Sequence, residues 1–459
     1  MKKTILIIIS FIFINCKPPL PEPRNPIIFN PISNESLAKG IIYEVNIRQY
    51  SNEGTFNAFS KDLSKIKELG VNIIWLMPTY PISKTKSKGT LGSYYAVSDY
   101  KGVNPEFGTL EDLKRLVYKA HQMGIYVIFD WVPGHTGWDH IWIKEHPEFY
   151  LKNEAGEIID PIDPRTGESF GWTDVADLNY DNSSMREAMK KAMLYWIKEV
   201  DIDGYRVDQA YAVPMDFYEN TFAAIKKLKP VFLLGETDAN HPGGMEHLKN
   251  FNASYDFPGY HLTKDIVHGH KSVNDYANHR ENFILKHDPA HLLLNFVSSH
   301  DENAWAGSVD ELYGEAAHAM MALNYMAPGL PFLYSGVEYD LNKRLLFFEK
   351  DSFPRVAGET YQLLKQLGEL KTTHPALHAG KEAGKYSPIE TSLRDKVLAF
   401  ERSKAGDTIV YIANMSKDHI GFTSPYNGMF KRYQDNKPKR LSYSYEYRMR
   451  PWEFWVLTK

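Results

Sequence analysis

Gly204-Tyr-Arg-Val-Asp208 and Phe232-Leu-Leu-Gly-Glu236 are two short apolar runs that each stop at a carboxylate. Such a run is typical of a buried parallel strand that delivers a polar group at its C-terminal tip. Two further runs of the same kind stop at Asp130 and at Asp301. Because helix-like segments separate the four runs, we predict a barrel whose strand ends gather acids at one mouth.

Strand-like and helix-like segments alternate from Gly40 onward. Thr109 and Asp112 form a predicted capping box at the start of one intervening helix. Eight strands with intervening helices predict an α/β fold, a (β/α)₈ TIM barrel. The expected strands lie at residues 41–47, 73–77, 126–130, 204–208, 232–236, 254–257, 294–298 and 331–334.

Two regions interrupt this alternation. Residues 136–182 follow the third expected strand, are rich in Asp, Pro, Gly and Trp, and are too long for an ordinary connection. They predict a small inserted domain over the barrel mouth. From residue 373 the pattern changes to short strands separated by turns, which predicts a C-terminal antiparallel β domain, a β-sandwich, over residues 373–459. Residues 40–372 are therefore assigned to the barrel that carries the acids.

The composition excludes several classes of protein. The chain has 459 residues, of which 43% are hydrophobic and 24% are charged, as expected for a folded globular protein. Its formal net charge of -4 leaves no basic surplus to attract nucleic acid, so we expect no nucleic-acid partner. Cys16 is the single cysteine, so an intrachain disulfide and metal sites built on thiolates are excluded.

The N-terminus has the pattern of a bacterial export signal. Two lysines precede an apolar run over residues 5–14, which is too short to span a bilayer. Phe13-Ile14-Asn15-Cys16 resembles a lipoprotein cleavage site, so we expect a signal peptide over residues 1–16 and a lipid on Cys16. A proline-rich tether over residues 17–39 would then join a membrane anchor, on the periplasmic side or at the cell surface, to the folded body. A plain export signal and an uncleaved anchor are the alternatives.

Asp208 and Glu236 end consecutive expected strands, so their carboxyl groups should face each other across a sugar-sized gap. Glycoside hydrolysis needs such a pair, because one acid protonates the departing oxygen while the other attacks the anomeric carbon or activates water. Arg206 lies two residues before Asp208 and shares its strand face, where a guanidinium keeps a nucleophile ionised. Asp301 supplies a third carboxylate, suited to binding sugar hydroxyls and an oxocarbenium-like transition state.

Four motifs resemble, in the same order, the sequence signatures of the α-amylase family of glycoside hydrolases. They are Asp130-Trp-Val-Pro-Gly-His135, Gly204-Tyr-Arg-Val-Asp208, Gly235-Glu236 and His300-Asp301. Tyr95-Ala-Val-Ser-Asp99-Tyr100 and Asp177-Leu178-Asn179 are further matches, and the similarity covers about residues 40–370. A set of motifs in a fixed order is far more specific than any one of them.

The resemblance implies a catalytic role for each matched acid. Asp208 would be the nucleophile, Glu236 the general acid/base and Asp301 the transition-state stabiliser. A structural alternative is that an acid at a strand end caps a helix or anchors a loop. Three buried acids facing one mouth would nevertheless be costly without a purpose. The chemistry of such a site requires no cofactor.

The resemblance also implies four substrate-binding residues and one supporting residue. Tyr95 would stack beneath the sugar at the cleaved position, and His135 and His300 would donate hydrogen bonds to it. Arg206 would be the partner of the nucleophile. Asp130 would give structural support through hydrogen bonds. The alternative for the two histidines is that they are ordinary core residues, with their ring nitrogens hydrogen-bonded inside the protein.

Two departures from the family pattern limit what the resemblance implies. Gly134 stands where many members have an asparagine that helps to bind a structural calcium, so the usual calcium site is doubtful and no other metal site is expected. Asp177 and other acids of the inserted segment remain candidate ligands for an ion. After the expected nucleophile the chain reads Gln-Ala-Tyr-Ala, without the Lys-His pair common in starch-cleaving amylases. Specificity beyond the cleavage point is therefore left open.

The leading hypothesis is a lipid-anchored, retaining hydrolase that cleaves α-1,4-glucosidic bonds of starch-like glucans or malto-oligosaccharides. The first alternative keeps the site but acts on short oligosaccharides, as an α-glucosidase or a glucan transglycosylase. The second is a non-catalytic surface glucan-binding protein. The presence of all three acids weighs against the second alternative, because a binding surface has no need of them.

Overall fold

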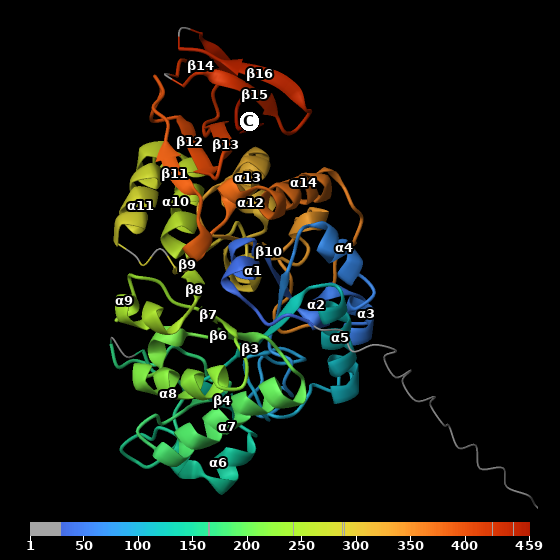
Figure 1. The fold of residues 1–459 in the computed structure, drawn as a ribbon. Helices are drawn as coiled ribbons and strands as arrows, with labels where there is room; N and C mark the ends of the chain where they lie inside the picture. The colour runs from blue at the N-terminus through green and yellow to red at the C-terminus, as the bar shows by residue number, and fades with distance from the viewer. Residues whose placement is uncertain are drawn as a thin grey trace, which may run out of the picture.

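The computed structural model confirms the barrel predicted from the sequence (Figure 1). The structure describes residues 29–163, 166–241, 243–286, 288, 290–424, 426–443 and 445–459, so Cys16, the signal peptide and most of the tether lie outside it. Eight parallel strands close in the order β1-β10-β9-β8-β7-β6-β3-β2. They are β1 (Ile42–Val45), β2 (Ile73–Leu76), β3 (Tyr126–Trp131), β6 (Gly204–Val207), β7 (Phe232–Gly235), β8 (Ala253–Tyr255), β9 (Leu292–Asn295) and β10 (Leu330–Tyr334).

Every residue of these eight strands is buried, which explains why the strands read as continuous apolar runs. Three predicted strand ends were wrong: β1 ends at Val45 and β8 at Tyr255, each two residues early, and β9 ends at Asn295 and does not reach Ser298. Phe296 stays buried by stacking on Tyr260 at 4.7 Å between ring centroids, so the apolar run outlasts the strand. Asp301 therefore lies beyond the strand end, at the start of a helical turn, η4 (Glu302–Ala306).

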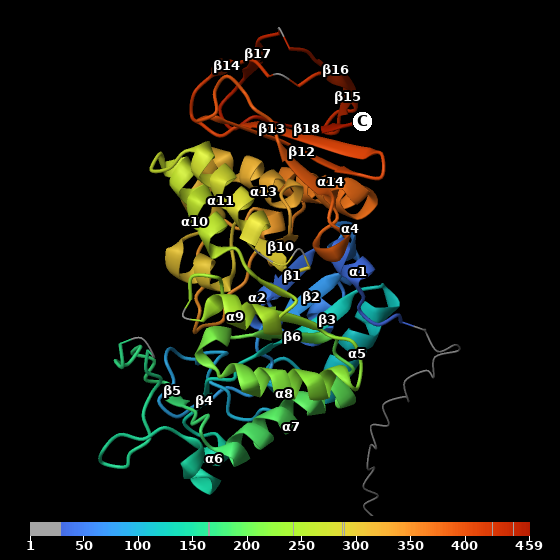
Figure 2. The same cartoon turned by 60° about the vertical axis from the view of Figure 1, so that its left-hand side comes forward.

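Helices lie around the barrel between its strands (Figures 1 and 2). The predicted capping box is confirmed at the start of α5, where Asp112 N donates to Thr109 Oγ1 and Thr109 N donates to Asp112 Oδ2. Within the part of the chain that the structure describes, no helix combines the length and apolar character needed to cross a bilayer. The helices are α1 (Asn34–Ala38), α2 (Ile47–Tyr50), α3 (Phe56–Phe59), α4 (Leu63–Glu68), α5 (Leu110–Gln122), α6 (Ile141–Glu145), α7 (Ser183–Glu199), α8 (Met215–Lys226), α9 (Gly244–His247), α10 (Phe257–His268), α11 (Val273–Lys286), α12 (Val309–Tyr313), α13 (Ala317–Met326) and α14 (Glu359–Thr373).

A small two-stranded sheet follows the third barrel strand. β4 (His135–Gly137) leaves the carboxyl end of β3 and pairs antiparallel with β5 (Val175–Asp177), with His135 opposite Asp177. With α6, this sheet lies at the end of the molecule opposite the C-terminal strands (Figure 2). The segment expected to form an inserted domain is therefore next to the carboxyl ends of the barrel strands.

The C-terminal segment forms two antiparallel sheets, as expected of an antiparallel β domain. Leu398 and Phe400 of β12 pack into the core shared with the barrel, whereas Val397 and Ala399 pack against the smaller sheet. This alternation has the period of two that a strand between two layers requires. The larger sheet has the order β11-β12-β13-β18-β15-β16 and the smaller pairs β14 with β17. The strands are β11 (Lys385–Pro388), β12 (Val397–Lys404), β13 (Asp407–Asn414), β14 (Ile420–Phe422), β15 (Gly428–Arg432), β16 (Lys437–Leu441), β17 (Tyr447–Met449) and β18 (Phe454–Thr458).

Candidate active site

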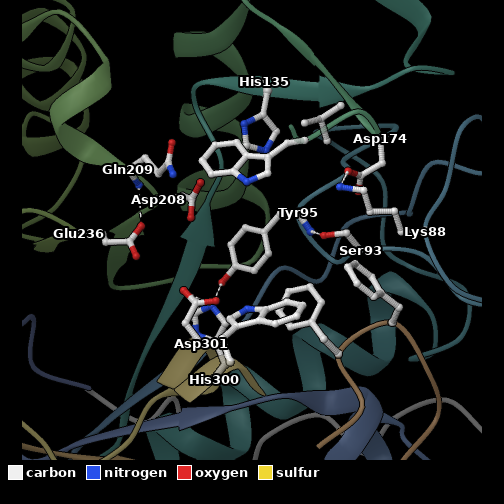
Figure 3. A pocket seen from close by; sticks show the side chains of 15 residues that line it. Lys88, Ser93, Tyr95, His135, Asp174, Asp208, Gln209, Glu236, His300 and Asp301 are labelled. Carbon is white, nitrogen blue, oxygen red and sulfur yellow. Dashed lines mark hydrogen bonds and ion pairs between the residues drawn. The ribbon is translucent and has the colours of Figure 1, made fainter. Parts of the chain in front are cut away.

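A cavity of about 510 Å³ opens at the carboxyl ends of the barrel strands (Figure 3). It collects side chains from strand ends, from the inserted segment and from the loop after β10. Arg206 and Asp130, which the sequence analysis also singled out, lie beneath it. The lining residues are Lys88, Ser93, Tyr95, His135, Trp172, Asp174, Val175, Asp208, Gln209, Glu236, His300, Asp301, Trp305, Phe347 and Phe348.

Asp208 and Glu236 leave adjacent strand ends and meet at one guanidinium. β6 and β7 pair with Val207 opposite Gly235, so the two acids are the next residues on neighbouring strands. Arg206 Nη1 lies 2.9 Å from Asp208 Oδ1, and its Nη2 lies 2.8 Å from Glu236 Oε2. Because both nitrogens belong to one planar group, the two carboxyls are held side by side at the same cavity (Figure 3). The backbone N–H of Gln209 donates a further hydrogen bond of 2.8 Å to Glu236 Oε2.

Asp130 and Arg206 form the buried base of the site. Arg206 Nη1 donates to Asp130 Oδ1 at 2.9 Å, and both side chains are fully buried. Asp130 Oδ2 also accepts hydrogen bonds from Trp75 Nε1 at 3.1 Å and from the Tyr95 hydroxyl at 2.9 Å. Arg206 was expected among the substrate-binding residues, but it lies under the cavity and binds three carboxylates there. Its side chain has no exposed surface and does not line the cavity, so it acts through the carboxylates that it binds.

His300 is held between Glu44 and Tyr95. Its Nδ1 lies 2.5 Å from Glu44 Oε1 and its backbone N–H donates to Glu44 Oε2 at 3.1 Å. Its Nε2 lies 2.8 Å from the Tyr95 hydroxyl, whose ring stacks on the imidazole at 5.4 Å between centroids. Burial alone disfavours the imidazolium, but the carboxylates of Asp301 and Glu44 raise the pKa of His300 to about 9. At neutral pH both ring nitrogens therefore carry protons.

Asp301 reaches the cavity from the start of η4, and His135 reaches it from the first residue of β4. The Asp301 side chain is 47% exposed, and its Oδ2 lies 3.3 Å from His300 Nε2. His135 begins β4 and is buried, which lowers the pKa of its imidazole to about 4. His135 is therefore neutral near pH 7, in contrast to the charged His300.

The two central carboxyls differ in how tightly they hold a proton. Burial raises the pKa of Asp208 to about 6, against the lowering effect of Arg206. Burial raises the pKa of Glu236 to about 7, and the neighbouring Asp208 charge adds to the rise. An ionised Asp208 thus favours retention of the proton on Glu236. One ionised and one protonated carboxyl at a single cavity is the state that acid-assisted nucleophilic chemistry requires.

Comparison with known proteins agrees with this geometry. A family model described as the catalytic domain of α-amylase matches residues 33–157 and 168–353. The chain belongs to the α-amylase family. The match ends before α14, so the C-terminal sheets lie outside it.

Two curated relatives and one solved structure illustrate the similarity of this α-amylase family chain. Alpha-amylase 3 of Dictyoglomus thermophilum is 28% identical over 342 residues, which cover 65% of this chain and 63% of that relative. Alpha-amylase MalA of Haloarcula japonica is 27% identical, covering 82% of this chain and 55% of the relative. The structure of the maltogenic α-amylase AmyB of Thermotoga neapolitana is 26% identical, with a TM-score of 0.83 over 92% of this chain and 99% of that one. The chain thus spans 63% and 55% of the length of these two curated relatives.

The usual calcium site of the α-amylase family does not fit the residues present here. Gly134 has no side chain to offer, and a Cβ added to it would meet nothing within 4 Å. The Asp177 carboxylate instead accepts a hydrogen bond of 3.4 Å from the backbone N–H of Ile162. Among the described residues, no three His, Cys, Asp or Glu side chains are grouped to hold an ion.

Several residues of this α-amylase family site were missed by the sequence analysis. Glu44 sits inside the apolar run of β1, where a charged residue in a fully buried strand is a signal that was available. Gln209 adopts a left-handed φ of 40°, which turns its N–H toward Glu236. Most of the remaining cavity residues come from loops whose sequences carry no periodic pattern, while Val175 lies in β5 and Trp305 in η4. The residues from loops are Lys88, Ser93, Trp172, Asp174, Phe347 and Phe348.

We expect Glu44→Gln to lower kcat/KM about 10- to 100-fold, because a hydrogen bond to a charged group contributes ~1.5–3 kcal/mol. Glutamine keeps the shape of the side chain but removes the charge that stabilises the His300 imidazolium. Without it the pKa of His300 should fall from about 9. Histidine titration by NMR and the pH profile of kcat/KM check this result.

Glu338→Gln is the matched control for this positioning residue. Glu338 is equally buried, but it binds the hydroxyl of Tyr43 at 2.5 Å, on the opposite face of β1 from Glu44. This variant should leave the His300 titration unchanged. An unchanged titration in Glu44→Gln as well would contradict the role given to Glu44.

Proposed function

We propose that this protein is a retaining glycoside hydrolase that cleaves α-1,4-glucosidic bonds of starch-like glucans or malto-oligosaccharides. The observation that carries the proposal is the pair Asp208 and Glu236, held by one guanidinium at one cavity. A retaining mechanism needs two carboxyls about 5–5.5 Å apart, and the contact of both carboxyls with one guanidinium supports a short separation here. Similarity to proteins described as α-amylases supports the choice of substrate.

In the first step, Asp208 attacks the anomeric carbon while Glu236 protonates the glycosidic oxygen. The C–O bond to the leaving sugar breaks, its electron pair takes the proton of Glu236, and an ester bond forms between the sugar and Asp208. Asp301 and the charged His300 face the same space and bind sugar hydroxyls as positive charge develops on the ring. Tyr95 supplies a flat surface beneath that ring.

In the second step, the now ionised Glu236 removes a proton from water. The oxygen of that water attacks the anomeric carbon, the ester bond to Asp208 breaks, and both carboxyls return to their starting states. Two displacements at one carbon retain the α configuration. All of these transfers fall on side chains of this chain, so we propose that the chemistry uses no cofactor.

The activity is expected to depend on pH in a bell shape. Asp208 must be ionised and Glu236 protonated, and their pKa values are raised to about 6 and about 7. We therefore expect kcat/KM to be highest near pH 6–7, to fall below that range as Asp208 takes up a proton, and to fall above it as Glu236 loses one. Initial rates on maltoheptaose between pH 4 and pH 9 measure both limbs. If kcat/KM did not fall up to pH 9, Glu236 would be excluded as the general acid.

The proposal is tested by incubating the purified protein with starch, maltodextrins, pullulan and trehalose. Reducing ends and product lengths show which bonds are cleaved, and proton NMR shows which anomer appears first. We expect α-anomers from α-1,4-linked substrates. β-anomers appearing first would rule out the double displacement. Transfer products in place of hydrolysis would favour a transglycosylase, and binding without cleavage would favour a glucan-binding protein.

We also propose that the protein is exported and anchored to a membrane through a lipid on Cys16. The proposal rests on the apolar run of residues 5–14, the cleavage pattern at residues 13–16 and the proline-rich segment that follows. The full-length chain made in a bacterium should incorporate labelled palmitate and partition into detergent, and Cys16→Ser should do neither. Release of unlabelled protein by the wild type would favour a plain export signal, and an uncleaved mass would favour a signal anchor.

A further inference from the structure

The two ends of the cavity are built differently. Glu236 and Gln209 line one end, while Lys88 and Asp174 line the other, with Asp208 and Tyr95 between them (Figure 3). Lys88 belongs to a stretch of the β2–α5 connection, residues 84–92, which we name the bridging loop. The contacts of this loop decide whether a glucan chain can pass through the second end.

On one side, the bridging loop is tied to the inserted segment. Lys88 Nζ lies 2.9 Å from Asp174 Oδ1 and donates to the carbonyl of Gly171 at 3.3 Å. The backbone N–H of Lys84 donates to Asp139 Oδ2 at 2.8 Å. The Asp174 side chain is 7% exposed and that of Lys88 is 35% exposed, so the ion pair lies half-buried in the wall of the cavity.

On the other side, the bridging loop is tied to the loop after β10. The backbone N–H of Leu91 donates to the carbonyl of Phe348 at 3.1 Å, and that of Thr90 donates to Glu349 Oε1 at 2.9 Å. Gly89 has φ +63°, and a Cβ there would lie 2.4 Å from Phe348 Cβ. The two loops are therefore in contact, with no room for even a methyl group at this point.

The bridging loop is also fixed from below. Arg48, which is 2% exposed, donates from Nη1 to the carbonyl of Gly92 at 3.2 Å and from Nη2 to that of Leu91 at 3.2 Å. The inserted segment, the bridging loop and the loop after β10 thus form one continuous wall. Hydrogen bonds and one ion pair hold this wall to the rest of the molecule from three sides.

The chemistry of the site determines which end of the substrate meets this wall. Glu236 protonates the leaving oxygen, so the leaving, reducing-end part of the chain lies on its side. The sugar attacked by Asp208, and any units beyond its non-reducing end, extend away from Glu236. That direction leads to Lys88 and Asp174.

We infer that the wall makes this enzyme act at the non-reducing ends of glucans, releasing short products of one length, with Lys88 and Asp174 as specificity-determining residues. The inference rests on the proposed hydrolase function and adds its mode of attack. A chain whose non-reducing end fits against the wall is cleaved at a fixed distance from it. A bond in the middle of a long chain cannot reach Asp208, because the wall stands where the chain would have to continue.

The test compares 4-nitrophenyl maltoheptaoside with the same compound carrying an ethylidene group on O4 and O6 of its non-reducing glucose. We expect cleavage of the free heptaoside to be at least about 10 times faster, because the blocked end cannot seat against the wall. β-Cyclodextrin, which has no end, should resist cleavage. Equal rates on both heptaosides would overturn the inference while leaving the hydrolase intact. Cleavage of neither would overturn the hydrolase proposal itself.

The Lys88→Ala and Asp174→Ala variants test the wall directly. Removing either side chain should open the wall. The rate on the blocked heptaoside, divided by the rate on the free heptaoside, should then rise severalfold. Lys229→Ala is the matched control, since it removes an ion pair of 3.0 Å to the buried Asp203 at the other end of the barrel and should leave the ratio unchanged. An unchanged ratio in both wall variants would overturn the assignment of Lys88 and Asp174.

Discussion

Asp208→Asn is expected to lower kcat on maltoheptaose by on the order of 10⁴-fold or more, because an amide cannot form the glycosyl ester on which double displacement depends. The amide oxygen can still accept the hydrogen bond that Arg206 donates to Asp208 at 2.9 Å, so the fold should persist. Release of reducing ends measures the loss, and a urea titration checks the fold.

Asp203→Asn is the matched control for this experiment. Asp203 is a fully buried carboxyl directly before β6, whereas Asp208 directly follows the same strand. It binds His121 at 2.8 Å and Lys229 at 3.0 Å, at the end of the barrel away from the cavity. The control should retain most of its kcat even where it loses stability. Retention of near wild-type kcat by Asp208→Asn would exclude Asp208 as the nucleophile.

Arg206→Met is expected to lower the free energy of unfolding by about 3–5 kcal/mol, because it leaves buried carboxylates without their cation. Arg206 binds Asp130, Asp208 and Glu236 from a position with no exposed surface. Its charge lowers the pKa of each of these groups. Without it both limbs of the pH profile should move to higher pH, since Asp208 and Glu236 would each hold a proton more tightly.

Arg280→Met separates the loss of stability from the change in chemistry. Arg280 is 2% exposed and binds Asp256 at 2.6 Å, but it lies outside the cavity. This control should lower the denaturation midpoint while leaving the pH profile of kcat/KM in place. A pH profile that also stays in place in Arg206→Met would contradict the electrostatic role given to Arg206.

The barrel could be predicted because its strands are buried on both faces, so that each is a continuous apolar run. The end of β9 could not be predicted, because Phe296 follows the last residue of the strand and is buried by ring stacking. The three acids could be placed at one mouth because parallel strands end on one side. The distance from Arg206 to Glu236 needed the register of β6 with β7, which no single strand reveals.

The local order of residues was enough to establish the barrel, the family and the acids at its mouth, because each follows from a run or motif of a few neighbours. Other features depend on contacts between segments far apart in the chain. Glu44 meets His300 across 256 positions, and the wall joins Lys88 to Asp174 and Leu91 to Phe348. Such contacts depend on how loops pack against one another, and loops carry no periodic pattern. Folding alone therefore decides the charge on His300 and the closed end of the cavity.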